Sequence, residues 1–162
     1  MWVYPNCSQE IDKDIKEMKN SPISLDLYFT DFVTKADRRK QYASDFTDEI
    51  NNNAIVLLDK VNSLLGELGI KTGDVTSGWR PAAINSKTAN AAKRSAHMIG
   101  KAVDLLDNDN QDLAKLVASR PDLLRKYELF MEDMNSTRGI NQNWVHLDYM
   151  VRSDRPNRIF IP

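Results

Sequence analysis

The two histidines of this chain, His97 and His146, are the residues whose type and spacing most clearly indicate chemistry. His97 lies in the segment Ser95–Asp104, which contains Gly100 and ends on an acid. Two imidazoles and one carboxylate make three protein ligands, and three ligands with an open fourth position are typical of a catalytic zinc rather than a structural one. A metal site is therefore the leading interpretation. The alternative is that each histidine is only a packed, hydrogen-bonded residue.

The elements around these residues must bring the three side chains together. His97 and Asp104 are seven residues apart, a spacing that does not align them on one helix face. They can converge if His97 closes a loop, Gly100 permits a tight turn and Asp104 projects from the following strand. His146 is then expected on a neighbouring strand, with its ring on the same face as Asp104. Zinc binds such nitrogens and oxygens at about 2.0–2.2 Å in a roughly tetrahedral array.

A helical part is predicted for the first 69 residues. Residues 8–45 are charged and helix-prone, with an interruption at Ser21-Pro22. Gly69 is a natural C-terminal stop for the next helix. The apolar residues of that helix recur at the spacing of one helix face: Ala54, Leu57, Leu58, Val61, Leu64, Leu65 and Leu68.

Short strands dominate the prediction after Gly69. Residues 84–94 are expected to form a short helix or loop, and a helix is expected from about Asp109 to Ala118, with another turn or two after Pro121. The strand candidates are residues 75–80, 101–106, 127–131, 144–150 and 158–161. Helices followed by a small antiparallel sheet are typical of an α+β fold.

Composition predicts one ordinary domain over residues 1–162. The chain is 41% hydrophobic and 28% charged, which is enough for a real core. Its 22 basic and 23 acidic residues predict no nucleic-acid partner. The basic residues at Arg38–Lys40 and at Arg152, Arg155 and Arg158 are expected on the solvated surface.

The cysteine content, the apolar stretches and the N-terminal residues favour synthesis in the cytoplasm of a bacterial host. Cys7 is the single cysteine, which excludes a disulfide framework and a cysteine metal site; Pro5–Ser8 is expected to form a turn. No apolar stretch is long enough to span a bilayer, so no membrane insertion is expected. Met1–Pro5 lacks the features of a secretory signal.

Three segments together resemble a known family. They are Ser-x-His-x-x-Gly-x-Ala-x-Asp at Ser95–Asp104, Ser-Gly-Trp-Arg at Ser77–Arg80 and Trp-x-His at Trp144–His146. The chain looks like the zinc peptidases that include D-Ala-D-Ala carboxypeptidases, vancomycin-resistance dipeptidases and phage L-alanyl-D-glutamate endolysins. The Hedgehog signalling domain shares that fold and metal site. The resemblance covers about residues 70–162 and is closest to small phage or prophage members. It implies a mainly helical part at residues 1–69 and a metallopeptidase-like core at residues 70–162.

The resemblance implies a role for each matching position. His97, Asp104 and His146 take the three places of the Zn²⁺ ligands. Arg80 takes the place of the arginine that binds substrate and steadies the developing oxyanion, although a structural ion pair is the alternative. Ser95 takes a hydrogen-bonding position near the site. The implied substrate is the stem peptide of peptidoglycan.

One catalytic position departs from the family pattern. Zinc-assisted hydrolysis needs a carboxylate to take and return a proton, and in the family this acid commonly lies three residues before the last histidine. Asn143 occupies that position, and an amide cannot accept the proton. Glu132 and Asp133 are the favoured substitutes; side chains alternate along a strand, so one should point inward. Asp148, about 7 Å beyond His146 on the same face, is better placed to support that histidine.

Three functions are therefore weighed. The first is a zinc peptidase that cuts the peptidoglycan stem peptide, in phage lysis at the cell wall or periplasm. The second is a zinc-binding module without turnover, a phage structural or wall-recognition domain, for which Asn143 is the argument. The third is an iron(II) oxygenase, but such sites place the carboxylate two residues from the first histidine, where this chain has Ile99. The sequence does not predict which bond is cut, a role for residues 1–50 or the oligomeric state.

Overall fold

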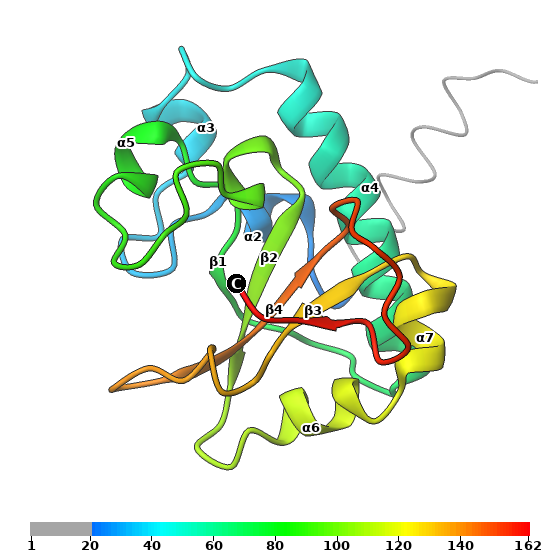
Figure 1. Ribbon diagram of the computed structural model, residues 1–162. Helices are drawn as coiled ribbons and strands as arrows, with labels where there is room; N and C mark the ends of the chain where they lie inside the picture. Colours follow the sequence, from blue (N-terminus) through cyan, green and yellow to red (C-terminus); the bar gives the residue numbers. More distant parts are fainter. Residues whose placement is uncertain (1–20) are drawn as a thin grey trace, which may run out of the picture.

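The longest helix within residues 21–162 is the one that its apolar spacing predicts. A computed structural model describes residues 21–162, so the turn at Cys7 and the helix-prone residues 8–20 lie outside the described residues. Helix α4 (Asp48–Glu67) begins after Thr47, whose side chain accepts from the backbone N–H of Ile50, and Gly69 follows its end with φ of 75° (Figure 1). Its buried residues confirm the predicted stripe: Ala54, Leu57, Leu58, Val61, Leu64 and Leu65.

The other helices are short and several have a side-chain cap. Ser24 caps α2 (Leu25–Phe29) and Asp37 caps α3 (Arg38–Gln41), each accepting from a backbone N–H two or three residues later, which is the usual role of such residues. After α4 come α5 (Ala82–Asn85), the 3₁₀ turn η1 (Ala96–Ile99), α6 (Asp112–Ala118) and α7 (Pro121–Lys126). The two helices predicted around residues 109–125 are confirmed.

In the described part of the chain, five strands form one sheet in the order β1-β2-β4-β3-β5. They are β1 (Val75–Ser77), β2 (Ala102–Asp107), β3 (Phe130–Glu132), β4 (Asn143–Asp148) and β5 (Ile159–Phe160). The pairs β1–β2, β2–β4 and β3–β4 are antiparallel, whereas β5 lies parallel to β3 at the edge. The α+β prediction is confirmed.

Four of the predicted strands are longer than those observed: β4 ends at Asp148 rather than at Met150, β5 is only Ile159–Phe160, and β1 and β3 are also shorter. β1 stops at Ser77 rather than continuing to Arg80. β3 begins at Phe130 rather than at Tyr127, because Tyr127 is the C-cap of α7 and Glu128 has a positive φ of 55°. A left-handed residue cannot continue an extended strand, so the chain enters the sheet only after Leu129.

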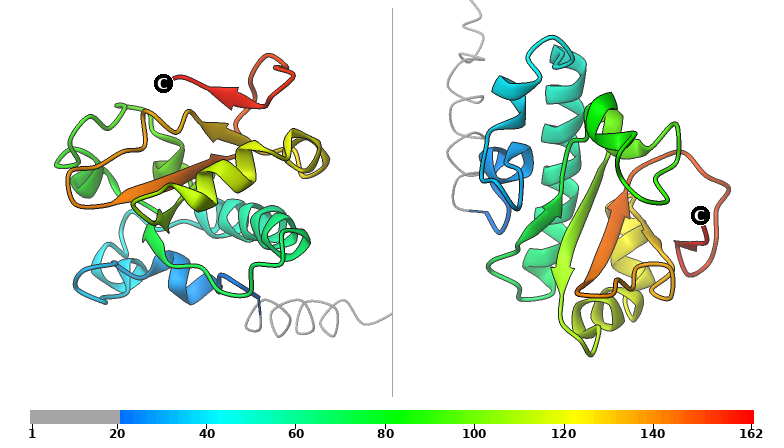
Figure 2. Two further views of the ribbon diagram at one scale, coloured as in Figure 1. Left: turned by 90° about the horizontal axis from the view of Figure 1, so that it is seen from below. Right: turned by 90° about the vertical axis from the view of Figure 1, so that its left-hand side faces the viewer.

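The sheet has one face on the core and one open face. Side chains alternate along β2 and β4, so Val103 and Leu105 lie opposite Leu147 and Val145 and join the core with α4. Figure 2 shows α4 along one side of the sheet and α6 near one end of the strands. Asp104 pairs with His146 and belongs to the opposite, open face. Among residues 21–162 no helix is long and apolar enough to cross a membrane.

Gly78, directly after β1, lies against the backbone of α2. A Cβ atom at this position would lie 1.9 Å from the backbone oxygen of Tyr28, far inside van der Waals contact. Tyr28 is fully buried and donates a hydrogen bond to the carbonyl of Ala102 in β2. Only glycine therefore allows the segment after β1 to lie against α2.

Replacing Gly78 with alanine is expected to lower the free energy of unfolding by about 3 kcal/mol, because overpacked cores must move backbone. Gly66, in the last turn of α4, has nothing within 4 Å of a built Cβ and provides the matched control. Gly66→Ala is expected to stabilise the protein by about 0.5–1 kcal/mol through helix propensity. Chemical denaturation of both variants measures this, and equal effects would contradict the assigned contact.

Candidate functional site

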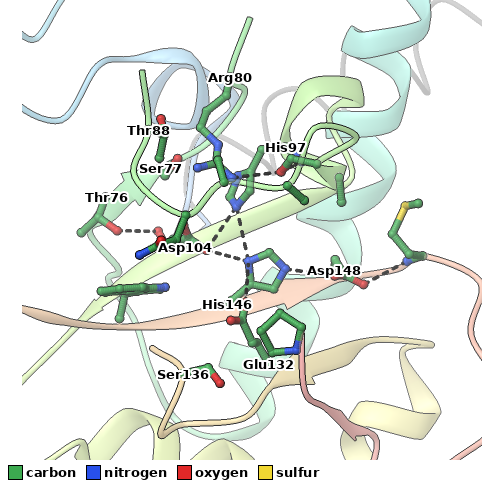
Figure 3. Close-up of a pocket in the computed structure, with 18 of the residues that line it drawn as sticks. Thr76, Ser77, Arg80, Thr88, His97, Asp104, Glu132, Ser136, His146 and Asp148 are labelled. Atoms are coloured by element: carbon green, nitrogen blue, oxygen red, sulfur yellow. Dashed lines mark hydrogen bonds and ion pairs between the residues drawn. The ribbon is translucent and has the colours of Figure 1, made fainter. Parts of the chain in front are cut away.

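Three buried donor atoms converge on the open face of the sheet, as Figure 3 shows. His97 Nε2 lies 3.2 Å from Asp104 Oδ1 and 3.3 Å from His146 Nδ1, and the last two atoms are 2.8 Å apart. A tetrahedral zinc with ligands at about 2.0–2.2 Å places its donors about 3.3–3.6 Å apart. The two distances from His97 Nε2 are thus close to those around a bound zinc. The distance between His146 Nδ1 and Asp104 Oδ1 would need to lengthen by about 0.5 Å. The three residues can hold a metal ion.

Local structure explains how residues that are distant in sequence meet here. Asp104 and His146 are direct partners in the β2–β4 ladder. His97 lies in η1, which Ser95 caps by accepting from the backbone N–H of His97 at 3.3 Å. Gly100 then turns the chain into β2 with φ of 77°. The predicted convergence of a loop, a glycine turn and two strands is confirmed.

Each imidazole is oriented by a partner on its other nitrogen. His97 Nδ1 lies 2.8 Å from the carbonyl oxygen of Gly78, which can only accept, so this nitrogen carries the proton. His146 Nε2 lies 3.0 Å from Asp148 Oδ2. These contacts leave His97 Nε2 and His146 Nδ1 to face the shared point. Such partners fix the tautomer and ring direction of metal-binding histidines.

The electrostatics of the cluster suit a cation. Burial lowers the pKa of His146, but its hydrogen bonds to Asp104 and Asp148 outweigh burial and raise that pKa to about 10. Burial alone raises the pKa of Asp104, yet the two histidines together hold it well below its usual range. Burial dominates at His97 and lowers its pKa. A divalent ion would therefore take the place of the proton that His146 otherwise carries.

Glu132 is the acid that lies beside the three donors. Its Oε2 is 3.9 Å from His146 Nδ1, and burial raises the pKa of its carboxyl. Asp133 turns away and accepts from the backbone N–H of Asn135 at 2.8 Å. Only one acid of the adjacent pair therefore faces the site, as strand alternation predicts. That acid is Glu132.

Asn143 lies outside the cleft. Its amide donates to the carbonyl of Asn108 at 3.1 Å. An odd spacing from His146 directs the two side chains to opposite faces of β4. The polar side chain at this position is thus not close to the donors, and its identity does not decide whether an acid is present.

Arg80 and Ser95 form a hydrogen-bonded pair next to His97. Arg80 Nη2 donates to Ser95 Oγ at 2.9 Å, and the backbone N–H of Arg80 donates to the carbonyl of His97 at 3.1 Å. Within the described part of the chain, Arg80 Nη1 has no protein acceptor. Figure 3 shows Arg80 and Glu132 on opposite sides of the donor cluster.

Several arginines expected on the solvated surface, among them Arg38, Arg152 and Arg158, are instead partly or fully buried. Arg38 is 8% exposed and donates to the carbonyl of Trp79 at 2.7 Å and to Asp31 at 2.8 Å. Arg152 forms a two-pronged ion pair with Asp148 and lies over the ring of Phe160. Arg158 stacks on Phe130. The surface prediction was wrong for these three residues, because charge alone does not show which arginines form ion pairs with carboxylates or stack on aromatic rings.

The donor cluster opens into a cleft of about 910 Å³. Its walls come from residues 76–96, from the 136–144 hairpin and from the C-terminal residues 150–162, with Glu132 and the metal-binding candidates between them. This volume is within the range of pockets that hold small ligands. The cleft is therefore large enough for a segment of peptide.

A comparison with protein-family models identifies the family. Residues 32–148 match the model described as Peptidase M15. The chain belongs to the Peptidase M15 family. The match extends further toward the N-terminus than the three motifs do, and it includes α4 together with His97, Asp104 and His146. Neither the search of curated proteins nor the search of solved structures found a match.

Asp148→Asn tests the support of His146 in this metallopeptidase-like site. The amide keeps the shape but loses the negative charge that Asp148 places beside His146 Nε2. We expect zinc affinity to fall about 10- to 100-fold, as for other partners of metal-binding histidines, while Asp122→Asn on the exposed face of α7 leaves it unchanged. Competition with a chromophoric chelator measures both affinities. Unchanged affinity in Asp148→Asn would contradict the assignment.

Proposed function

We propose that this M15 protein is a zinc-dependent peptidase that hydrolyses a peptide bond in the stem peptide of peptidoglycan. The observation that carries the proposal is the convergence of two oriented imidazoles and one carboxylate, with the Glu132 acid beside them. Family membership adds the peptidase class. We further propose a role in phage lysis or wall degradation, with synthesis in the host cytoplasm and action at the cell wall.

The three donors fit zinc in number, type and spacing. His97, Asp104 and His146 would hold the ion and leave its fourth position toward the cleft. Bound there, zinc would polarise the substrate carbonyl and lower the pKa of a water toward about 7. The donor set is also that of some iron enzymes, but family membership favours the peptidase over the oxygenase.

Glu132 supplies the proton transfer in this proposal. Its carboxylate lies within 3.9 Å of His146 Nδ1, which is the atom directed at the proposed ion. From that position it takes a proton from the attacking water and returns it to the leaving amine, so that the peptide bond breaks into an acid and an amine.

Arg80 binds and orients the substrate. Ser95 holds its Nη2 at 2.9 Å, so the guanidinium does not have to be ordered when the peptide arrives. Nη1 remains available to donate to the scissile carbonyl oxygen as negative charge develops on it. Ser95 acts indirectly, because the same oxygen caps the turn that carries His97.

The binding-module alternative loses its main argument. That hypothesis depended on Asn143 in the usual position of the base, yet Asn143 does not contact the donor cluster and binds Asn108 instead. Glu132 lies on β3, the strand that pairs with β4, and its contact with His146 supports it as the acid of the proposed reaction. We therefore propose turnover rather than binding alone.

The experiment is fragment release from purified peptidoglycan, followed by mass spectrometry of the products. The full chain with zinc is expected to release stem-peptide fragments, and EDTA is expected to abolish release because the water is no longer activated. Glu132→Gln should retain zinc but lose about 10²- to 10⁴-fold in rate. The matched control is Asp133→Asn, which removes the neighbouring acid that faces away and should leave the rate unchanged.

The new termini would also identify the bond that is cut. Stoichiometric zinc without any fragment release would contradict the peptidase and restore the binding module. Equal loss in Glu132→Gln and Asp133→Asn would contradict the assignment of the base.

A further inference from the structure

The 3₁₀ turn that carries His97 is held by hydrogen-bond donors from outside the turn. The backbone N–H of Arg80 donates to the carbonyl of His97 at 3.1 Å. The indole of Trp79 donates to the carbonyl of Met98, also at 3.1 Å. Both donors belong to the Ser-Gly-Trp-Arg segment. A third donor reaches the next carbonyl, that of Ile99, and it lies in none of the three motifs and has no part in the proposed chemistry.

The third donor is the side chain of Asn53 in α4. Its Nδ2 donates to the carbonyl of Ile99 at 2.8 Å, which is the shortest of the three contacts. A Cβ atom on Gly100 would lie 2.6 Å from the backbone oxygen of Ile50, so the turn lies directly on the first half of α4 (Figure 1). Asn53 thus ties the end of the turn to the second turn of the long helix.

The same residue also contacts the segment that follows His146. The hydroxyl of Tyr149 donates to Asn53, at 3.1 Å to its backbone oxygen and at 3.4 Å to its Oδ1. Tyr149 directly follows Asp148, the partner of His146 Nε2. Its backbone N–H donates to the carbonyl of Lys101 at 3.3 Å and so extends the pairing of β4 with β2. Asn53 therefore contacts both of the chain segments that carry the histidines of the donor cluster.

Asparagine is an unfavourable residue at this position unless its amide is used. Residues 51–53 are three successive asparagines inside α4, although asparagine is a poor helix former whose side chain competes for backbone hydrogen bonds. Within residues 21–162, Asn53 is the one of the three whose side chain has hydrogen-bond partners. Asn52 is exposed. The two neighbours therefore differ in their contacts while they share a residue type and a helix.

We propose that Asn53 is a positioning residue that holds the two histidine-bearing segments at the separation that a metal ion needs. Its amide offers both a donor and an acceptor; the donor holds the turn of His97, and the acceptor binds the segment after His146. Side chains that are ordered before the ion arrives bind it more tightly, because binding does not have to order them. The inference rests on the proposed function in taking these two histidines and Asp104 as zinc ligands.

The test is the zinc affinity of the full chain, measured by competition with a chromophoric chelator under conditions where every variant is folded. Asn53→Asp keeps the shape and the oxygen that Tyr149 contacts, but it removes the N–H that Ile99 accepts. The added negative charge by itself favours a cation, so charge and positioning predict effects of opposite sign. We expect the affinity to fall about 5- to 10-fold, less than for a group that touches a metal-binding histidine directly.

Two further variants and a second measurement separate positioning from a general loss of structure. Asn52→Asp adds the same charge at the neighbouring exposed position and should not lower the affinity. Asn53→Gln keeps an amide and should recover part of the loss. In the metal-free protein, the backbone N–H of Lys101 closes the turn by donating to the carbonyl of Ala96 at 3.0 Å. Its hydrogen exchange should be about 5- to 10-fold faster in Asn53→Asp, because the turn opens more often.

The inference and the proposed function fail in different ways. Equal zinc affinity in the parent and Asn53→Asp, an equal loss in Asn52→Asp, no recovery in Asn53→Gln, or unchanged exchange at Lys101 would overturn the inference alone. Zinc binding by the parent without fragment release from peptidoglycan counts against the peptidase and leaves the effect of Asn53 on affinity measurable. A parent protein that binds no zinc would overturn both.

Discussion

The register of β2 on β4 is the constraint on which the metal site depends. It places Asp104 directly opposite His146 on the open face, while Val103 and Leu105 meet Leu147 and Val145 on the face toward α4. A slip of one residue would move every side chain of a strand to the other face. The burial of the apolar pairs therefore fixes the placement of the donors, and the core and the site are consequences of the same pairing.

The third donor depends on contacts that lie outside the sheet. His97 is carried by a single 3₁₀ turn, and its ring is directed by the carbonyl of Gly78. That carbonyl is in place only because Gly78 can approach the backbone of Tyr28 in α2. On the other side, Asp148 orients His146 and is itself held by Arg152 from the C-terminal segment. Helix α2 and the C-terminal residues thus both determine the donor geometry.

Much of this arrangement could be predicted from periodicity and motif. A period near four identified the buried face of α4, and a period of two placed Asp104 and His146 on a common face. The same alternation could also have shown that Asn143 faces away from His146, since their spacing is odd. The choice between Glu132 and Asp133 could not be predicted, because it depends on where α7 ends and β3 begins.

The side chains that sequence reasoning missed are arginines. Arg38 and Arg152 have their roles through tertiary partners, namely the carbonyl of Trp79 and the carboxylate of Asp148. No local pattern marks such residues, because an arginine with a buried partner and one in solvent look alike in sequence. The parallel β5 edge was likewise not predicted, since two residues carry no periodicity.

The most direct test of the proposed metal site is the structure of the zinc-loaded protein, with the ion located by anomalous scattering at the zinc edge. We expect one ion at about 2.0–2.2 Å from His97 Nε2, His146 Nδ1 and an oxygen of Asp104, with the fourth position toward the cleft. Zinc bound at another site, or His97, Asp104 and His146 still hydrogen-bonded to one another with zinc present, would contradict it.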